Sequence, residues 1–204
     1  MEQQKESATL GMWIFLATEI LFFGGLFLTY TVNRHTYPEI FAECSKSLDL
    51  KLGGFNTVVL ILSSLTMAMS VWSAQVGKKK LITLFLILTL LLGCVFLGVK
   101  AIEYHAKYVE HHIPGLPFQF EPGSDVATNA HAQLFFSLYF GMTGLHATHM
   151  VVGAGLLLWL IRQSLKGRFT PQYNTPVENI GLYWHFVDIV WIYLFPLLYL
   201  IDRH

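Results

Sequence analysis

Five long stretches of the chain are almost entirely apolar, and shorter polar segments separate them. They run over about residues 10–32, 53–76, 81–102, 131–161 and 178–201. A helix of roughly 20 predominantly apolar residues can cross a bilayer, and each stretch reaches that length. The pattern therefore predicts an all-α fold, a polytopic membrane helix bundle with five transmembrane helices, in a single membrane domain covering residues 1–204.

The connections between the predicted spans are unequal in length. The turn GKKK at 77–80 joins the second span to the third, whereas residues 33–52 and 103–130 form longer connections. The segment HHIPGLPFQFEPGSD in the longer one is rich in Pro and Gly, which favours an irregular surface loop. The N-terminal segment MEQQKESATL has no basic stretch before the first apolar run, so we expect no cleaved signal peptide.

The composition agrees with a membrane protein. Hydrophobic residues make up 54% of the chain and charged residues 13%, whereas an ordinary soluble domain carries about 25% charged residues. The formal net charge is zero, so nothing indicates nucleic acid as a partner. Cys44 and Cys94 lie far apart in the sequence and predict neither a disulfide framework nor a thiolate metal site.

Lysine and arginine in the loops predict the orientation of the spans. One side of the membrane receives the N-terminus and the second and fourth loops, which carry Lys5, Lys78, Lys79, Lys80, Arg162, Lys166 and Arg168. The other side carries Arg34, Lys46, Lys51, Lys107 and Arg203, with Lys100 near the end of its span. The excess predicts a cytoplasmic N-terminus and an external C-terminus.

Polar residues inside the spans need partners within the protein, because lipid offers none. A set of small polar side chains shares one face of the second span and predicts a close contact with another helix. The set consists of Asn56, Ser63, Thr66, Ser70 and Ser73.

Glu19 lies near the middle of the first span, in WIFLATEILFFGG. An isolated ionised carboxylate at that depth costs at least ~2.5 kcal/mol, so we expect Glu19 to stay neutral unless a cation or hydrogen-bond donors reach it. Two roles fit this residue equally well. It either bonds a neighbouring helix or forms a proton-handling or lipid-contacting site.

The end of the third span, GVKAIEYHAKY, carries charges at helical spacing. Lys100 and Glu103 are three residues apart, and Glu103 and Lys107 are four apart, so ion pairs on one helix face are expected. We favour a structural pair at the membrane edge.

Histidines appear in the last two spans at equivalent spacings. His146 and His149 lie on one face of the fourth span, and His185 and Asp188 lie on one face of the last, where Trp184 precedes His185. A carboxylate that orients an imidazole is found both in metal sites and in structural networks. The sequence favours a hydrogen-bond network within the bundle.

A membrane di-iron enzyme requires its histidines to converge at one depth. The external segment supplies Glu103, His105, His111 and His112, whereas His146 lies roughly 22 Å along its own helix at 1.5 Å per residue. The chain also lacks the C-x-x-C-H sequence of covalent haem attachment and any obvious axial histidine pair. We therefore expect no cofactor and no metal in this chain.

Three segments resemble, in this order, signature segments of subunit III of the haem–copper terminal oxidases. They are LGMWIFLATEILFFGGLF, GLHATHMVVG and YWHFVDIVWIYLF, and the KAIEYHAKY segment is similar to the Glu-Tyr segment of the same family. The resemblance covers essentially the whole chain. The long form of this subunit has seven spans, and this chain begins at the equivalent of the third, as in the five-span bacterial forms.

The resemblance implies an accessory subunit without haem or copper, since these belong to partner subunits. Such a subunit packs on subunit I, in a complex that also contains subunit II, binds phospholipid between its helices, and helps to sustain proton uptake and turnover in the bacterial cytoplasmic membrane. The buried carboxylate of the family corresponds to Glu19. The other corresponding residues are Glu103, His146, His149, Trp184, His185 and Asp188. The resemblance also suggests that His185 and Asp188 bond each other or a lipid headgroup.

Other assignments stay open on the sequence. The partner complex is that of a cytochrome c oxidase, a quinol oxidase or a nitric oxide reductase, which these motifs do not distinguish. A different class is a proton-coupled transporter that uses Glu19 and Asp188. Such a transporter is expected to have broken helices around a site at the membrane midplane.

Overall fold

The computed structural model describes residues 2–110, 112–115, 118, 120 and 126–201. The helices found in this part of the chain are α1 (Glu2–Thr36), α2 (Pro38–Lys46), α3 (Leu50–Val76), α4 (Lys79–Val109), α5 (Val126–Leu165) and α6 (Thr175–Tyr199). All except α2 are long and apolar enough to cross a membrane, which confirms the prediction of an all-α bundle with five spans. These spans are continuous helices, unlike the broken helices expected of the transporter alternative.

Local sequence explains several helix ends. The Asp49 side chain accepts hydrogen bonds from the backbone amides of Lys51 and Leu52, at 2.8 and 3.3 Å, and so caps the start of α3. Gly77 ends the same helix in the left-handed conformation, with φ of 78°, which glycine adopts without steric cost. Prolines in the first turn of α2 and α6 lack an amide hydrogen that would otherwise have no partner.

The structure departs from the expected boundaries between the spans and at several helix ends, including the start of α1 at Glu2. Residues 33–52, predicted as a connection, contain the nine-residue helix α2, which buries Phe41 and Cys44. It is too short to produce an apolar run of the kind that revealed the spans. The third span continues as helix to Val109 and the fourth begins at Val126, because polar residues can extend a helix beyond the bilayer.

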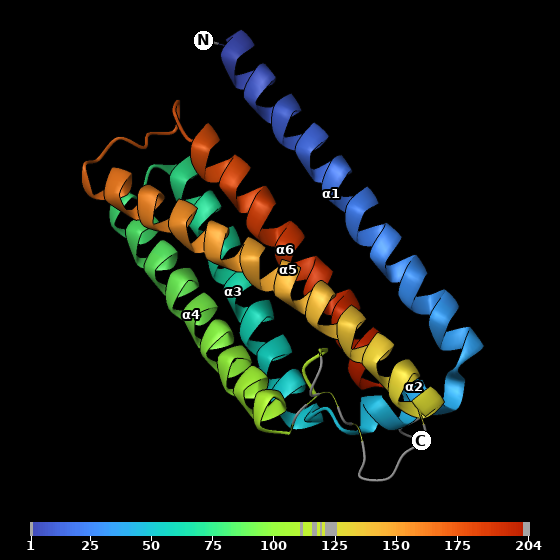
Figure 1. Cartoon of the computed structure of the whole chain (residues 1–204). Coiled ribbons are helices and arrows are strands. Elements are labelled where there is room, and N and C mark those ends of the chain that lie inside the picture. Colours follow the sequence, from blue (N-terminus) through green and yellow to red (C-terminus); the bar gives the residue numbers. More distant parts are fainter. Residues whose placement is uncertain (1, 111, 116–117, 119, 121–125, 202–204) are drawn as a thin grey trace.

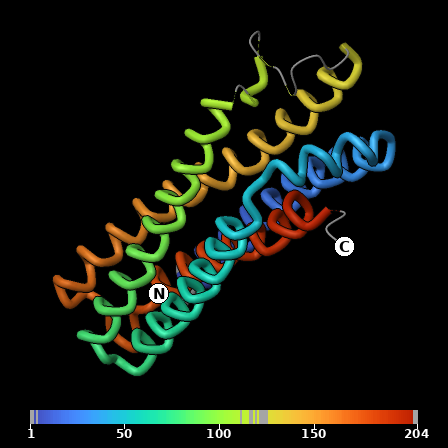
Figure 2. Tube along the Cα trace, turned by 90° about the horizontal axis from the view of Figure 1, so that it is seen from below, coloured from blue at the N-terminus to red at the C-terminus, as the bar shows by residue number. Residues whose placement is uncertain are grey.

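The helices α3 to α6 pack together, and α1 lies along one side of this bundle (Figure 1). In the described part of the chain α1 contacts α2, α5 and α6 but neither α3 nor α4. The start of α1 and the end of α6 lie at opposite ends of the molecule, as an odd number of spans requires. Figure 2 shows that the α3–α4 turn and the α5–α6 connection lie at the same end.

Close helix packing depends on small residues that face large ones. A Cβ atom on Gly93 of α4 or Gly153 of α5 would lie 2.9 Å from the Trp184 ring, so these glycines form the two walls of a slot for that side chain. The Trp184 indole donates to Ser63 Oγ of α3 at 2.9 Å. Trp184 therefore contacts all three of the other helices in the bundle.

The small polar face of the second span is buried, as predicted. Asn56, Ser63, Ser70 and Ser73 are inaccessible, and Thr66 bonds Thr89 of α4 at 2.8 Å. The predicted close contact between helices is therefore confirmed, with α4 and α6 as the neighbours.

Candidate functional site

The most connected polar group of the described residues is a buried cluster at the α2 end of the bundle, made by Lys100, Glu103, Tyr139 and Tyr199. Lys100 Nζ lies 3.0 Å from Glu103 Oε2 and donates to Tyr199 Oη at 2.8 Å. Glu103 Oε1 accepts hydrogen bonds from Tyr139 Oη, at 2.7 Å, and from Tyr199 Oη. We call these four residues the Lys100 cluster, which ties α4 to α5 and α6.

Aromatic rings surround the Lys100 ammonium group. Its nitrogen lies 4.8 Å from the centroid of the Trp191 ring and 5.2, 5.4 and 5.7 Å from the rings of Tyr139, Tyr199 and Tyr104. Ring faces attract cations most strongly where water is excluded. The carboxylate and the rings together offset part of the cost of removing this charge from water.

The helical spacing also allowed an ion pair between Glu103 and Lys107, but this pair does not form in the structure. Lys107 Nζ instead donates to the Ser47 carbonyl at 2.8 Å and pairs with Glu110. Both oxygens of Glu103 already have partners in the interior, whereas Lys107 lies one turn farther out. Helical spacing predicted both pairings, and only the tertiary contacts select between them.

Glu19 meets His149, a partner that spacing along one helix could not reveal. Its Oε2 atom lies 3.2 Å from His149 Nε2. The other ring nitrogen, Nδ1, donates to the Leu145 carbonyl at 3.0 Å, so Nε2 faces Glu19 either as an acceptor or, in the imidazolium, as a donor. Glu19 and His149 therefore meet across the contact between α1 and α5.

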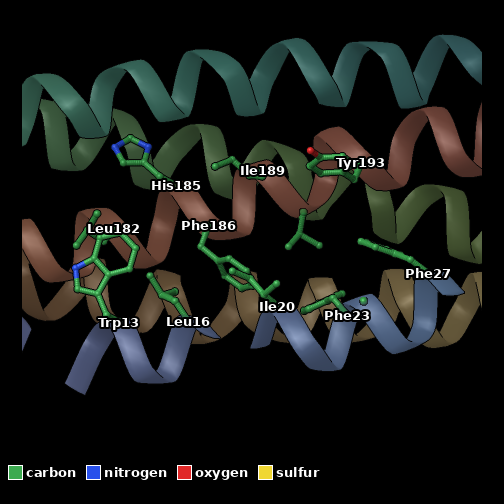
Figure 3. A pocket seen from close by; sticks show the side chains of 12 residues that line it. Trp13, Leu16, Ile20, Phe23, Phe27, Leu182, His185, Phe186, Ile189 and Tyr193 are labelled. Atoms are coloured by element: carbon green, nitrogen blue, oxygen red, sulfur yellow. The ribbon is translucent and has the colours of Figure 1, made fainter. Parts of the chain in front are cut away.

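An apolar groove of about 500 Å³ runs between α1 and α6 beside this pair. Figure 3 shows Leu16, Ile20 and Phe23 of α1 facing Phe186 and Ile189 of α6. The remaining lining residues are Trp13, Gly24, Phe27, Leu182, His185, Val190 and Tyr193. Such a wall, apolar with polar tips near its edges, is complementary to a hydrocarbon chain.

The two histidines of the fourth span have different surroundings. His146 is fully buried with ring centroids of Trp191 and Phe96 at 5.3 and 5.4 Å, and neither ring nitrogen has a hydrogen-bond partner among the described residues. His149 lies at the edge of the bundle against Glu19. The spacing placed His146 and His149 on one side of α5. Because α1 passes beside His149, that histidine has a partner on α1, whereas His146 has none among the described residues.

His185 and Asp188 do not bond each other, which contradicts the first of the two arrangements that the resemblance suggested. His185 Nδ1 pairs with Ser64 Oγ at 2.7 Å. Both Asp188 oxygens lack a hydrogen-bond partner in the described part of the chain. The sequence therefore located these polar residues but not their contacts.

Trp191, one turn beyond Asp188, packs inside the bundle. Its indole donates to Thr57 Oγ1 of α3 at 3.1 Å. Nothing in the sequence distinguishes Tyr139 and Tyr199 of the Lys100 cluster, since tyrosine near the end of a span is common in membrane proteins. Only a search for donors to the Glu103 carboxylate could have found them.

No group of three His, Cys, Asp or Glu side chains in the described residues lies close enough to hold a metal ion. His111, one of the external histidines considered above, lies outside the described residues. His112 contacts Glu110 at 3.2 Å and stacks on Phe136, and burial lowers the pKa of its ring. Through these contacts His112 packs the segment after α4 against α5.

Comparison with known proteins places this arrangement in a family. The sequence model of the family "Cytochrome c oxidase subunit III" matches residues 2–112 and 119–202. Quinol oxidase subunit 3 of Bacillus subtilis is 32% identical over 204 residues, covering 98% of this chain and 91% of that protein. Cytochrome c oxidase subunit 3 of Corynebacterium diphtheriae is 33% identical over 196 residues, covering 95% and 88%. The chain belongs to the cytochrome c oxidase subunit III family.

Proposed function

We propose that this chain is an accessory subunit of a haem–copper respiratory oxidase and contains no active site of its own. The match of the family to almost the whole chain carries this proposal. The catalytic subunit I and subunit II are the proposed partners, and they hold the haem and copper. The Lys100 cluster and the Trp184 slot give this subunit a rigid surface on which subunit I packs.

The groove between α1 and α6 is the proposed site for phospholipid acyl chains. Its walls are apolar and come from α1 and α6 (Figure 3). Glu19 and His149 hold α1 against α5 beside it, so the pair sets the width of the groove. Through this contact Glu19 supports long-term turnover and proton uptake by the catalytic subunit without taking part in oxygen reduction.

The proposed location is the bacterial cytoplasmic membrane, with the N-terminus in the cytoplasm. The basic turns after α3 and α5 lie at one end of the bundle, and basic turns remain on the cytoplasmic side. The Lys100 cluster, at the opposite end, then lies toward the external surface.

Purification of a tagged form of this chain in mild detergent tests the assignment. We expect a haem–copper catalytic subunit to copurify in a fixed ratio, and optical spectra to show haem in the complex. Recovery of the chain with a different enzyme, or alone under conditions that preserve other membrane complexes, would refute the assignment.

A pair of substitutions tests the groove. Gly24 lines the groove and neighbouring Gly25 does not, and a Cβ atom at either position meets no neighbour within 4 Å. We expect Gly24→Phe to reduce the phospholipid retained by the complex and the number of turnovers before inactivation. Gly25→Phe should change neither, and equal effects of the two variants would contradict the role of the groove.

A further inference from the structure

The end of the bundle that carries the short turns is strongly basic. Its exposed basic residues are Lys78, Lys79, Lys80, Arg162, Lys166 and Arg168. Packing between the turns brings them together, because a Cβ atom on Gly77 would lie 3.1 Å from Pro171 and one on Gly167 would lie 3.6 Å from Lys79 Nζ. We call these six residues the basic end.

The charges of the basic end are not neutralised within the protein. None of the six takes part in an ion pair in the described part of the chain. The acidic residue of the first turn of α6, Glu178, accepts a hydrogen bond from Gln75 at 2.9 Å instead. The surface therefore presents an uncompensated positive field at the depth where lipid headgroups lie.

Lys78 is held in a defined place on this surface. Its ammonium nitrogen lies 4.9 Å from the centroid of the Trp72 ring, in a cation–π contact. Trp72 is partly exposed on the outside of α3, and tryptophan at this position in a span is typical of the membrane–water interface. Lys78 is thus fixed above an aromatic ring at the boundary between headgroups and hydrocarbon.

A surface depression of about 430 Å³ begins at the same ring and runs between α3 and α6. Its floor and walls include Ala68, Val71, Trp72, Gly181 and Leu182, and it extends from Glu178 to His185. Seven residues of helix separate its ends, or roughly 10 Å at 1.5 Å per residue. It adjoins the groove beside α1, with which it shares Leu182 and His185, but its other wall is α3.

We propose that this depression holds one anionic phospholipid, with the phosphate at Lys78 and the first part of an acyl chain between α3 and α6. Charge complementarity favours an anionic headgroup, since basic residues next to a membrane attract anionic lipids. The apolar depression continuous with Trp72 favours a chain-bearing ligand over a free ion. The inference rests on the proposed role as a lipid-binding membrane subunit and adds a second, charge-selective site to it.

Glu178 opposes the phosphate and limits the affinity of the site. Its carboxylate lines the same depression, and its hydrogen bond to Gln75 disperses only part of its charge. Removing this charge should therefore strengthen binding, which a purely apolar groove would not show.

Native mass spectrometry of the assembled oxidase tests the proposal. The complex is placed in nanodiscs with equal amounts of phosphatidylglycerol and phosphatidylcholine, and the lipids retained after detergent washing are counted. We expect one phosphatidylglycerol to be retained at this site, with a several-fold loss of its occupancy in Lys78→Gln and a gain in Glu178→Gln. Lys51→Gln, an exposed lysine at the other end, serves as the charge control.

The acyl chain is tested separately. Ala68→Phe fills the depression and should lower the same occupancy, whereas Ala101→Phe on the exposed face of α4 should not. Millimolar inorganic phosphate should leave the lipid in place. Displacement by phosphate alone, equal retention of phosphatidylcholine, or no change in both Lys78→Gln and Ala68→Phe would overturn the proposal.

The same variants separate this inference from the proposed function. Lys78→Gln and Ala68→Phe should still copurify with the catalytic subunit at the normal ratio. Loss of lipid only together with loss of that subunit would mean that the partner covers this face, and the lipid site would then be rejected while the family role stands.

Discussion

Two acid–base pairs lie within the spans, and their surroundings differ. Glu103 and Lys100 are 3% and 4% exposed and are enclosed by three helices and four aromatic rings. Glu19 and His149 are 19% and 15% exposed and join one outer helix to the bundle. The first pair has further hydrogen-bond partners for each charge, whereas the second has one contact across a helix boundary.

The difference follows from how deeply each pair is buried: one lies in the packed core and the other at an outer helix. In the most apolar part of α6, 56% of the residues are buried, against 11% in α1. The Lys100 cluster therefore belongs to a fixed core, because removing Lys100 would leave the buried Glu103 without a cation. The Glu19–His149 pair instead joins the outer helix α1 to α5 through a polar contact.

The largest effect is expected from breaking the enclosed pair. Lys100→Leu leaves Glu103 without its cation, and removing one partner of a buried pair costs about 3–5 kcal/mol. We expect a loss of that size in the free energy of unfolding, measured by denaturant titration in mixed micelles. Lys79→Leu, at an exposed position, serves as the control and should change stability by less than about 0.5 kcal/mol. Equal stability of the two variants would show that the cluster is not part of the core.

Overpacking the Trp184 slot should cost less. Gly93→Ala places a methyl group against the Trp184 ring, and strain of this kind costs about 1–3 kcal/mol. Gly24→Ala, on α1, meets open space and should raise stability slightly through the helix propensity of alanine. Unfolding free energies measured in the same micelles should fall in Gly93→Ala and rise slightly in Gly24→Ala. Destabilisation by both substitutions would remove the contrast between the core and α1.

Breaking the outer pair should have a smaller and more local effect. Glu19→Leu removes the contact with His149, at a cost of about 1 kcal/mol. We expect spin labels on α1 and α6 to show a broader distance distribution, while labels on α3 and α4 keep theirs. Glu19→Gln keeps a hydrogen-bonding side chain and should retain the narrow distribution and initial turnover, with fewer turnovers before inactivation. Complete loss of initial turnover in an assembled Gln variant would contradict an accessory role.

The smallest expected effect concerns the corner between α1 and the bundle, where α2 lies. Burial raises the pKa of the Cys44 thiol to about 12, so the reactive thiolate is almost absent at pH 8. Maleimide should leave Cys44 unmodified at that pH until α2 separates from the bundle. A cysteine at the exposed neighbouring position, Glu43→Cys in a Cys44→Ser background, should react rapidly. Fast labelling of native Cys44 would show that α2 opens readily.

Run lengths in the sequence were sufficient to predict five spans, because a bilayer imposes a minimum apolar length on each helix. They missed α2, which is held by the burial of Phe41 and Cys44 and not by length. The sequence also identified Glu19, Glu103 and His149 as candidate site residues, because a polar residue inside a membrane span requires a partner. The identity of the partner depends on which helices meet, and no spacing within one helix contains that information.

The sequence by itself determined the class of protein, the helices that cross the membrane, and the family. These properties follow from apolar length and from local motifs such as YWHFVDIVWIYLF, which do not depend on how the helices pack. The tertiary structure decided that Lys100 pairs with Glu103 and that His149 contacts Glu19. It also separated His185 from Asp188, because side chains far apart in the chain pair only when packing brings them within hydrogen-bond distance.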